Sequence, residues 1–338
     1  MKLYGGIDLH SNNCVMVLLD EEDRVVYEKR LPNDLGYVLL ELAPYQGRVD
    51  GLVVESTFNW YWLVDGLMEA GYPVHLANTA AIQQYTGLKY TDDRSDARWL
   101  AHLLRLKLLP EGYIYPKEER AVRDLLRKRS QLVRQKVTHI LSIQNLMSRN
   151  KGLGLRADKI RQLTDAEVEG LLPQVDLARA VKSNLAVYRC LVEEIDGLEK
   201  VVKQRLKLRP SFQHLLTVDG IGSILGLTIM LETGDIGRFA RVGQFASYCR
   251  CMDSHKSSQG KRKGSGNTKN GNKYLAWAFV EAANFAICYN PRVKRFYQRK
   301  KDQTNGMVAL KAVAHKLARA CYYILRDQVP FQVEKAFG

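Results

Sequence analysis

Two short apolar runs near the start of the chain each end in an acidic residue. Residues 3–7 (LYGGI) lead to Asp8, and residues 52–54 (LVV) lead to Glu55. Short apolar runs bounded by polar residues predict buried strands, so both carboxylates are expected on strands of one fold. A carboxylate that is buried without a partner is costly. We expect either a metal ion or a buried ion pair to relieve that cost at Asp8.

A third acidic feature is the segment T-D-D-R-S-D-A, which opens a helical pattern and carries Asp93 and Asp96 three positions apart. Side chains at that spacing lie on one face of a helix. Acidic residues also cap helices, and Asp92 is available for that role while Asp93 and Asp96 point inward. The order strand-Asp, strand-Glu, helix Asp-x-x-Asp is much more specific than any one of its members.

This set of acids predicts a site for two divalent cations. Mg²⁺ prefers oxygen ligands, usually one or two carboxylates together with phosphate and water. Two such ions about 4 Å apart can hold the attacking and leaving oxygens of a phosphodiester. We therefore expect Mg²⁺ at Asp8, Glu55, Asp93 and Asp96, with nucleic-acid strand cleavage as the chemistry. His10 is interpreted as a polar neighbour of this site, not as a ligand.

The charge of the chain indicates the same class of substrate. Its 338 residues carry a formal net charge of +15, and such a surface attracts polyanions. The basic residues are spread over several segments, which disfavours a single amphipathic stripe on a membrane. The longest uncharged apolar run, residues 221–231, is too short to span a bilayer. The six cysteines form no C-x-x-C pair, so we expect reduced thiols in a cytoplasmic, nucleoid-associated protein.

The chain divides into three predicted domains. Residues 1–110 begin with an antiparallel meander of three strands and then alternate helix and strand, which predicts a mixed α/β sheet domain. Residues 111–210 carry two long helical patterns, 117–150 and 177–206. These would form either an α-hairpin or an intermolecular coiled coil, and we interpret them as the oligomerisation region. Residues 211–338 predict a helical domain.

Several basic and glycine-rich segments are candidates for binding nucleic acid. Gly220 and Gly222 precede an apolar helix and resemble a helix-hairpin-helix turn, whose amides can hold a phosphate; a plain tight turn is the alternative. Residues 253–273 predict an irregular basic loop, where nearby cations would stabilise a serine alkoxide. A flexible loop that binds only the nucleic-acid backbone is the alternative. The cationic candidates are Arg127, Lys128, Arg129, Lys256, Lys261, Arg262, Lys263 and Lys269.

Taken together, these motifs resemble those of a known family. G-I-D-L-H around Asp8, V-V-E-S-T around Glu55 and T-D-D-R-S-D-A are similar to the catalytic motifs of the DEDD transposases of insertion-sequence family one-ten and of the Piv/MooV invertases. Nearer the C-terminus, V-D-G-I-G, E-T-G-D-I-G-R-F, S-S-Q-G and T-K-N-G-N-K-Y-L are similar to that family's transposase segment. The resemblance spans nearly the whole chain.

The resemblance implies an RNase H-like sheet domain of the RuvC type and a recombinase activity on DNA. By position, the four acids would hold Mg²⁺ and the scissile phosphate. Ser258, with Ser257 as the alternative, would be the nucleophile that forms a covalent phosphoserine. The resemblance also implies double-stranded donor and target DNA, a structured non-coding guide RNA, and a homo-oligomer that is a dimer and becomes a tetramer at synapsis.

Two other functions are compatible with the residues alone. A RuvC-like, metal-dependent junction nuclease would use water as its nucleophile, and composition and spacing without the resemblance favour this function. A non-catalytic nucleic-acid scaffold would use the four acids structurally. A Ser258→Ala variant separates the first two, because a transposase would lose its covalent DNA adduct whereas a nuclease would continue to cut.

Overall fold

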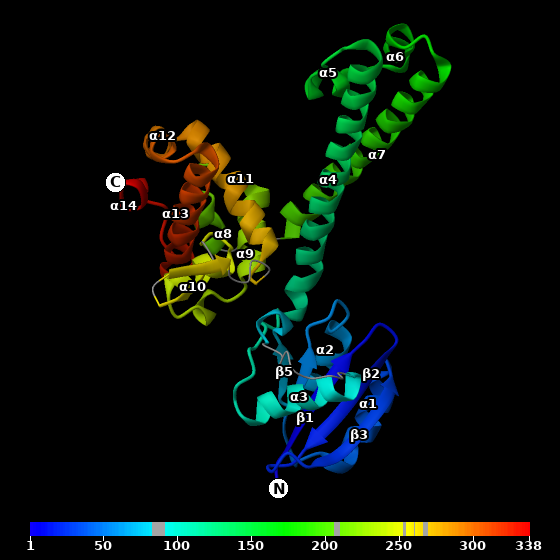
Figure 1. Cartoon of the computed structure of the whole chain (residues 1–338), viewed down its shortest axis with the longest axis vertical. Coiled ribbons are helices and arrows are strands. Elements are labelled where there is room, and N and C mark those ends of the chain that lie inside the picture. The colour runs from blue at the N-terminus through cyan, green and yellow to red at the C-terminus, as the bar shows by residue number, and fades with distance from the viewer. Residues whose placement is uncertain (83–91, 206–209, 253–254, 260, 266–269) are drawn as a thin grey trace. The chain divides into compact units, whose positions relative to one another are not determined.

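A computed structural model of the chain describes residues 1–82, 92–205, 210–252, 255–259, 261–265 and 270–338 (Figure 1). Its contacts divide it into two compact units, Met1–Lys117 and Glu118–Gly338. The division into three domains at residues 110 and 210 stays a prediction. Among the helices of the described residues, none is both long and apolar enough to cross a bilayer.

The first unit is built on a mixed five-stranded sheet with strand order β3-β2-β1-β4-β5. The first three strands form the predicted antiparallel meander, and β4 and β5 run parallel to β1. A mixed α/β sheet domain is therefore confirmed. The strands are β1 (Leu3–Leu9), β2 (Asn13–Leu19), β3 (Val25–Pro32), β4 (Val49–Glu55) and β5 (Val74–Ala77).

Helices cover the two faces of this sheet differently. Helices α1 (Leu35–Leu42) and α2 (Tyr61–Glu69) pack through large apolar side chains on the face to which β1 contributes Ile7 and Leu9. Helix α3 (Asp93–Arg105) packs on the other face through Ala97 and Ala101. Successive side chains of a strand alternate between faces, which explains the two sets. Short 3-10 turns lie at Ala43–Tyr45 and Thr79–Ala81.

The close packing of α3 depends on a glycine in β1. A Cβ atom at Gly6 would lie 1.9 Å from the carbonyl oxygen of Ala97 and 2.8 Å from the amide nitrogen of Ala101. No side chain larger than hydrogen fits there unless the helix moves. Gly6 therefore allows the backbone of α3 to approach the strand directly, and this approach positions the first turn of α3 beside the end of β1.

The second unit contains an antiparallel pair of long helices, α4 (Lys117–Lys151) and α7 (Val175–Arg205). Ile143, Met147, Val181 and Leu185 form their shared apolar seam together with α5 (Ala157–Gln162) and α6 (Asp165–Leu171). His139 Nδ1 lies 2.9 Å from Asn184 Oδ1 across the pair. Within one chain these helices thus form an α-hairpin, and coiled-coil pairing with another copy stays a prediction.

The remaining helices of this unit surround a second core. Helix α9 is buried on nearly every side, and its core includes Phe245, Phe279, Leu317 and Cys321. Val122, Leu126 and Val202 belong to the same core. The N-terminal part of α4 and the C-terminal end of α7 are therefore packed into it. The helices are α8 (Pro210–Leu215), α9 (Ser223–Thr233), α10 (Val242–Tyr248), α11 (Lys273–Tyr289), α12 (Pro291–Gln303), α13 (Gly306–Asp327) and α14 (Val333–Phe337), with a 3-10 turn at Ile236–Arg238.

The basic segment before α11 is not a plain loop. It contains an antiparallel hairpin of β6 (His255–Ser258) and β7 (Lys261–Ser265), so the prediction of an irregular loop was wrong for these residues. Their sequences, HKSS and KRKGS, contain none of the apolar alternation from which strands are predicted. Polar strands of this kind leave no signal of that type in the sequence.

Candidate catalytic site

Asp8 and Glu55 lie at neighbouring strand ends. In the parallel pair of β1 and β4, Ile7 is opposite Val54, so the next residue of each strand places a carboxylate at the same edge of the sheet. Asp8 is 3% exposed. Burial, a side-chain hydrogen bond with Asp8 and the negative charges of Asp8 and Asp96 raise the pKa of Glu55 to about 8. Glu55 is therefore protonated at neutral pH while no cation is bound.

Asp96 reaches the same edge from α3. Asp92 is the N-cap of this helix, and its Oδ1 accepts a hydrogen bond from the amide of Ser95 at 2.8 Å. The capping role thus falls on Asp92, as the sequence allowed. Burial, then the charges of Asp8 and Asp93, raise the pKa of Asp96. The same cause acts at Glu55, which shows that several negative charges are crowded together here.

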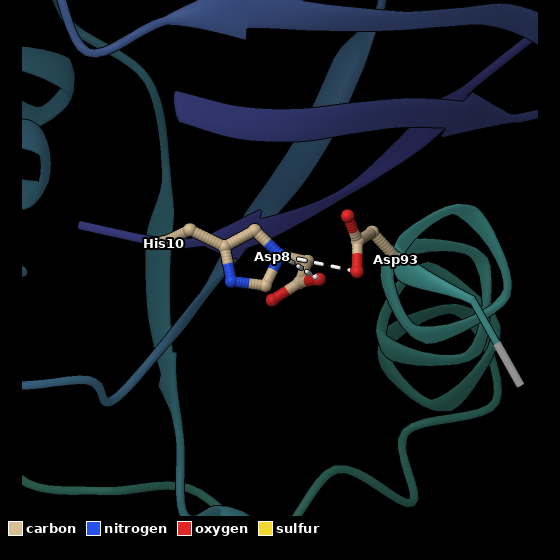
Figure 2. Close-up of side chains that lie close together, drawn as sticks. All are labelled: Asp8, His10 and Asp93. Carbon is tan, nitrogen blue, oxygen red and sulfur yellow. Dashed lines mark ion pairs between the residues drawn. The ribbon is translucent and has the colours of Figure 1, made fainter. Parts of the chain in front are cut away.

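Asp93 is linked to Asp8 through an imidazole. His10 Nε2 lies 3.2 Å from Asp8 Oδ2 and 3.2 Å from Asp93 Oδ1 (Figure 2). One possible ligand atom from each of these three residues lies within 4.8 Å of the other two. Arg30 Nη2 donates a hydrogen bond to Asp93 Oδ2 at 2.6 Å, and this bond lowers the pKa of Asp93. Asp93 thus has a guanidinium partner, Arg30, in addition to the imidazole that it shares with Asp8.

The backbone beside His10 is fixed by two amide side chains. Asn33 Nδ2 and Asn59 Nδ2 each donate a hydrogen bond to the carbonyl oxygen of His10 at 2.9 Å. The Nε2 atom of His10 is buried and has no hydrogen-bond partner among the described residues. Its contacts with the carboxylates of Asp8 and Asp93 are therefore close but lack hydrogen-bond geometry. The imidazole therefore faces the acids from a rigid strand end, with a nitrogen left available.

These residues suit a divalent cation. Nearby negative charges help raise the pKa values of Glu55 and Asp96, and a hard cation with oxygen ligands would offset those charges. Neighbouring ligands around an octahedral ion with bonds of about 2.1 Å lie roughly 3 Å apart. The two contacts of His10 Nε2, each 3.2 Å long, are close to that spacing. The donor set of carboxylates with one imidazole thus fits such an ion.

The predicted nucleophiles lie in the second unit. Ser257 and Ser258 are the last residues of β6, where Ser258 pairs with Lys261 and Ser257 with Arg262 across the hairpin. The turn contains Gln259, whose φ is +52°. Lys261 and Lys263 are exposed on β7, Lys256 lies on β6, and Lys269 lies outside the described residues. Ser257 and Ser258 therefore lie on a hairpin whose strands also contain four lysine or arginine residues: Lys256, Lys261, Arg262 and Lys263.

The basic residues at the start of α4 are partly engaged within the protein. Arg127 Nε donates to Glu232 Oε1 at 2.6 Å, and Arg129 pairs with Glu199 at 2.9 Å. Lys128 Nζ lies 3.5 Å from Gln131 Oε1. Contact of these cations with nucleic acid stays a prediction. The acidic partners of Arg127 and Arg129, Glu232 and Glu199, are far away in the sequence and leave no local signal. The sequence therefore did not reveal these pairs.

Glu232, on α9, is the centre of a buried network. It is 2% exposed and accepts hydrogen bonds from Arg123, from Arg127 and, at 2.7 Å, from Asn272 Nδ2. Burial alone would raise its pKa, but the hydrogen bond from Arg127 and the charge of Arg123 lower the pKa of Glu232 below its usual value. Asn272 also caps α11 by accepting from the amides of Tyr274 and Leu275, so the network joins α4, α9 and α11.

The two glycines before α9 have different surroundings. Gly220 has φ +91°, and a Cβ there would lie 2.4 Å from the carbonyl oxygen of Ala282 on α11. Gly222 is the N-cap of α9, and a Cβ there would meet no described atom within 4 Å. Gly220 is therefore required by its backbone conformation and by helix packing, and phosphate binding at this turn stays a prediction.

Comparisons with known proteins agree on one family. A family model for DEDD transposases of the IS110 type, described as transposase, matches residues 5–150. A second, described as the transposase IS116/IS110/IS902 family, matches residues 212–298. The two matches lie one in each half of the chain and include all four predicted acids and both serines.

Similar full-length proteins carry the same description. The chain is 26% identical over 342 residues to the transposase for insertion sequence element IS1328 of Yersinia enterocolitica, over 96% of this chain and 97% of that protein. It is 22% identical over 339 residues to the transposase for insertion sequence element IS1111A of Coxiella burnetii, over 96% and 87%. It is 25% identical over 287 residues to a probable family 20 transposase of Pseudomonas aeruginosa, over 80% and 82%.

The mixed sheet with acids at one edge and the two matched segments define a DEDD-type DNA transposase with an RNase H-like domain. The chain belongs to the IS110 family of insertion-sequence transposases, as its motifs predicted. Membership of this family implies DNA as the substrate and use of a divalent metal ion.

Proposed function

We propose that this transposase cuts and exchanges DNA strands with a Mg²⁺ site formed by Asp8, Glu55, Asp93 and Asp96, and with Ser258 as nucleophile. The observation that carries the proposal is the crowding of carboxylates at one sheet edge, where the pKa of Glu55 rises to about 8. Raised pKa values of this kind cluster at functional sites. Ser257 is the alternative nucleophile.

Each residue has a distinct task in this mechanism. When bound, the metal ions supply positive charge to the oxygens of the scissile phosphate. Asp8 and Glu55 hold ligand positions from the sheet, Asp93 and Asp96 from α3, and His10 adds a nitrogen ligand. Arg30 keeps the Asp93 carboxyl ionised and oriented.

The covalent step is a transesterification. The Ser258 oxygen forms a bond to phosphorus as the bond to the 3′ oxygen of DNA breaks, so the serine loses a proton and the leaving oxygen gains one. The products are a 5′-phosphoserine and a free 3′-hydroxyl. Attack by a 3′-hydroxyl of the partner DNA reverses the step and joins new strands. The number of phosphoester bonds is conserved, so no nucleotide cofactor is needed.

The partners follow from the same proposal. Double-stranded donor and target DNA are paired with a structured non-coding bridge RNA, and the net charge of +15 favours binding of both nucleic acids. The α4–α7 hairpin forms a coiled coil with a second copy, giving a dimer and, at synapsis, a tetramer. The turn at Gly220 and Gly222 acts as a helix-hairpin-helix element that holds a phosphate through the amides at the start of α9.

Trapping the covalent adduct tests the nucleophile. The full chain is incubated with its DNA and Mg²⁺, quenched in denaturant and digested, and the phosphopeptide is identified by mass spectrometry. A modified β6 peptide is expected, which Ser258→Ala removes and the matched control Ser257→Ala retains. The reverse pattern would assign Ser257. An adduct on another residue would contradict the proposal.

A junction nuclease that uses water is the second candidate. It is favoured by one observation, namely that all four acids belong to the first unit. A Ser258→Ala, Ser257→Ala double variant that still cleaves DNA at the wild-type rate would establish this alternative. Loss of cleavage in that variant, with retained DNA binding, would exclude it.

A further inference from the structure

A cavity of about 720 Å³ lies in the second unit, outside the site described above. One wall is α13, and the other is the segment 329–336, which runs into α14 (Figure 1). Small-molecule sites in proteins commonly have volumes of about 300–1,000 Å³. None of the four acids and neither serine lines this cavity, so the proposed strand exchange does not use it.

The walls of the cavity carry an excess of positive charge. His315, Lys316, Arg319, Arg326 and Lys335 line it. The acid that lines it is Asp327, and this carboxylate is paired with the neighbouring Arg326 at 2.7 Å. The other four basic residues that line the cavity have no acidic partner among its lining residues.

The positive charge of Arg319 affects the pKa of two other residues that line the cavity. Burial and then the charge of Arg319 lower the pKa of both His315 and Lys316. A cation whose pKa is lowered by a neighbouring positive charge gains stability when an anion binds beside it. The disturbance agrees with the geometry of the cavity and indicates a site for a negatively charged group.

The cationic groups differ in how firmly they are held. Lys316 Nζ donates to the carbonyl oxygen of Ala336 at 2.7 Å, and it lies 5.1 Å from the ring centre of Phe296. Arg319 and Lys335 are exposed, and neither makes an ion pair with any residue in the described ranges. One cation is therefore fixed in the wall, while two remain able to reach a ligand.

An aromatic surface adjoins these cations. Tyr323 lines the cavity and is 39% exposed, and the Arg326 guanidinium lies 4.9 Å from its ring centre. Phe331 lines the opposite wall. Proteins recognise single-stranded nucleic acid by stacking its bases on aromatic side chains while cations contact its phosphates. The cavity presents both kinds of group within one hollow.

We propose that this cavity binds one nucleotide of a single-stranded nucleic acid, with its base on Tyr323 and its phosphate on Arg319 and Lys335. The shared chemistry is a nucleoside monophosphate unit, which either an RNA strand or a displaced DNA strand provides. The inference goes beyond the proposed strand exchange, because a chain inactive in recombination would still have this site.

Salt-dependent binding tests the cationic part. A fluorescein-labelled oligouridylate of about ten nucleotides is titrated with the full chain at several salt concentrations. Replacing both cations, Arg319→Gln with Lys335→Gln, should weaken binding roughly tenfold and reduce the slope of log K against log salt by roughly 0.7, because the two cations share one phosphate and each neutralised phosphate on a single strand contributes about 0.7. The control pair, Arg156→Gln with Lys311→Gln, removes equal charge from exposed positions that do not line the cavity and should leave the slope unchanged. Equal effects of the two pairs would overturn the proposal.

Photo-crosslinking tests the stacking part. An oligouridylate with one 5-iodouridine should crosslink to a peptide containing Tyr323. Tyr323→Leu should weaken binding by between about 5-fold and 100-fold, whereas Tyr323→Phe, which keeps the ring, should remain within about twofold. Identical affinities of the Leu and Phe variants, or crosslinks confined to other helices, would overturn the assignment.

Two further probes identify the source of the nucleotide. Tighter binding of the oligouridylate than of an oligodeoxyuridylate of equal length would support an RNA strand, and the reverse order would support a DNA strand. Full competition by inorganic phosphate at millimolar concentration, with no gain from the nucleoside, would contradict a nucleotide site.

Discussion

Two glutamates, one in each unit, have opposite surroundings. Glu232 is buried among Arg123, Arg127 and Asn272, and these partners lower its pKa. Glu55 shares its edge of the sheet with Asp8 and Asp96, and these acids together with burial raise its pKa to about 8. The same side chain is therefore ionised and fully paired in one place, and protonated and surrounded by like charge in the other.

The difference separates a structural acid from a site that needs an external cation. A buried carboxylate with two guanidiniums and an amide has all its partners within the protein, so its task is to hold helices together. A cluster of acids that repel one another destabilises the empty protein and gains stability when a divalent ion binds. Burial and acidity alone do not distinguish these two cases; the sign of the pKa shift and its cause do.

Removing Glu232 should give the largest loss of stability. Glu232→Ala leaves Arg123 and Arg127 in or beside the core without their partner, and breaking one side of a buried pair costs about 3–5 kcal/mol. Chemical denaturation should show this decrease in the free energy of unfolding. The control Glu199→Ala, which breaks the more exposed pair with Arg129, should cost less than about 1 kcal/mol. Equal losses would remove the distinction between the two pairs.

Removing an acid from the other cluster should have the opposite effect on stability. Asp8→Asn removes a negative charge beside Asp96, so the metal-free protein should unfold at a higher temperature than the wild type. Strand cleavage should nevertheless fall by roughly 10²–10³, as when a preorganised charge-stabilising group is lost. Thermal unfolding in EDTA and a cleavage assay measure the two effects. A metal-free variant that is much less stable would assign Asp8 a structural role.

The close contact at Gly6 provides a third test, since it links the sheet to α3. Gly6→Ala introduces a methyl group 1.9 Å from the Ala97 carbonyl oxygen, and overpacking of this kind costs about 1–3 kcal/mol. The helix must shift, and Asp93 and Asp96 shift with it. Mn²⁺ affinity should therefore fall further than for the control Gly71→Ala, whose φ of +86° is strained for alanine but whose Cβ would meet no described atom within 4 Å. Unchanged affinity in Gly6→Ala would disconnect helix position from the site.

His10 offers a finer distinction within the acid cluster. If its nitrogen is a ligand, electron paramagnetic resonance of bound Mn²⁺ should show ¹⁴N coupling that His10→Gln removes, with affinity roughly tenfold lower. If the imidazole only balances the charges of Asp8 and Asp93 in the empty site, the variant should bind Mn²⁺ as tightly or more tightly. Wild-type protein that binds no Mn²⁺ at all would contradict the whole metal site.

The dependence of stability on pH gives a further test of the comparison. Glu55 has a pKa of about 8 when folded against an ordinary value of 4.5, so between these values the folded state binds more protons than the unfolded state. The free energy of unfolding contributed by Glu55 is then fully present below pH 4.5 and is lost as the pH rises to about 8. In the absence of metal, the difference in the free energy of unfolding between the wild type and Glu55→Gln should follow this trend with pH. Glu232, with its lowered pKa, contributes in the opposite sense, and its stabilisation is lost as the pH falls.

Much of the architecture could be predicted from the sequence, because it follows from local patterns. Apolar runs predicted the strands of the sheet domain, and helical periodicity predicted the two long helices. The chain order of four acids was enough to expect one cluster. In each case the signal lies within a few residues of the element concerned.

The partners of the site residues could not be predicted in this way. Arg30 meets Asp93 across 63 positions, and Arg127 meets Glu232 across 105, and a basic residue carries no local mark of such a distant partner. His10 was predicted as a polar neighbour of the site, and its contacts with Asp8 and Asp93 agree with that prediction; it lies two positions after Asp8, and side chains two apart on a strand share a face. The β6–β7 hairpin is polar throughout, so its strands escaped a method based on apolar alternation.

The contacts of Asn272 have a structural consequence. Its side chain donates a hydrogen bond to the Glu232 carboxylate, and its backbone amide donates to the Tyr248 carbonyl at 2.6 Å. The residue is the N-cap of α11 and follows the basic hairpin segment. Arg123 and Arg127 donate hydrogen bonds to the same carboxylate from α4. The Glu232 carboxylate thus connects the long helix α4 directly to the residue that starts α11, next to the segment that carries the serines.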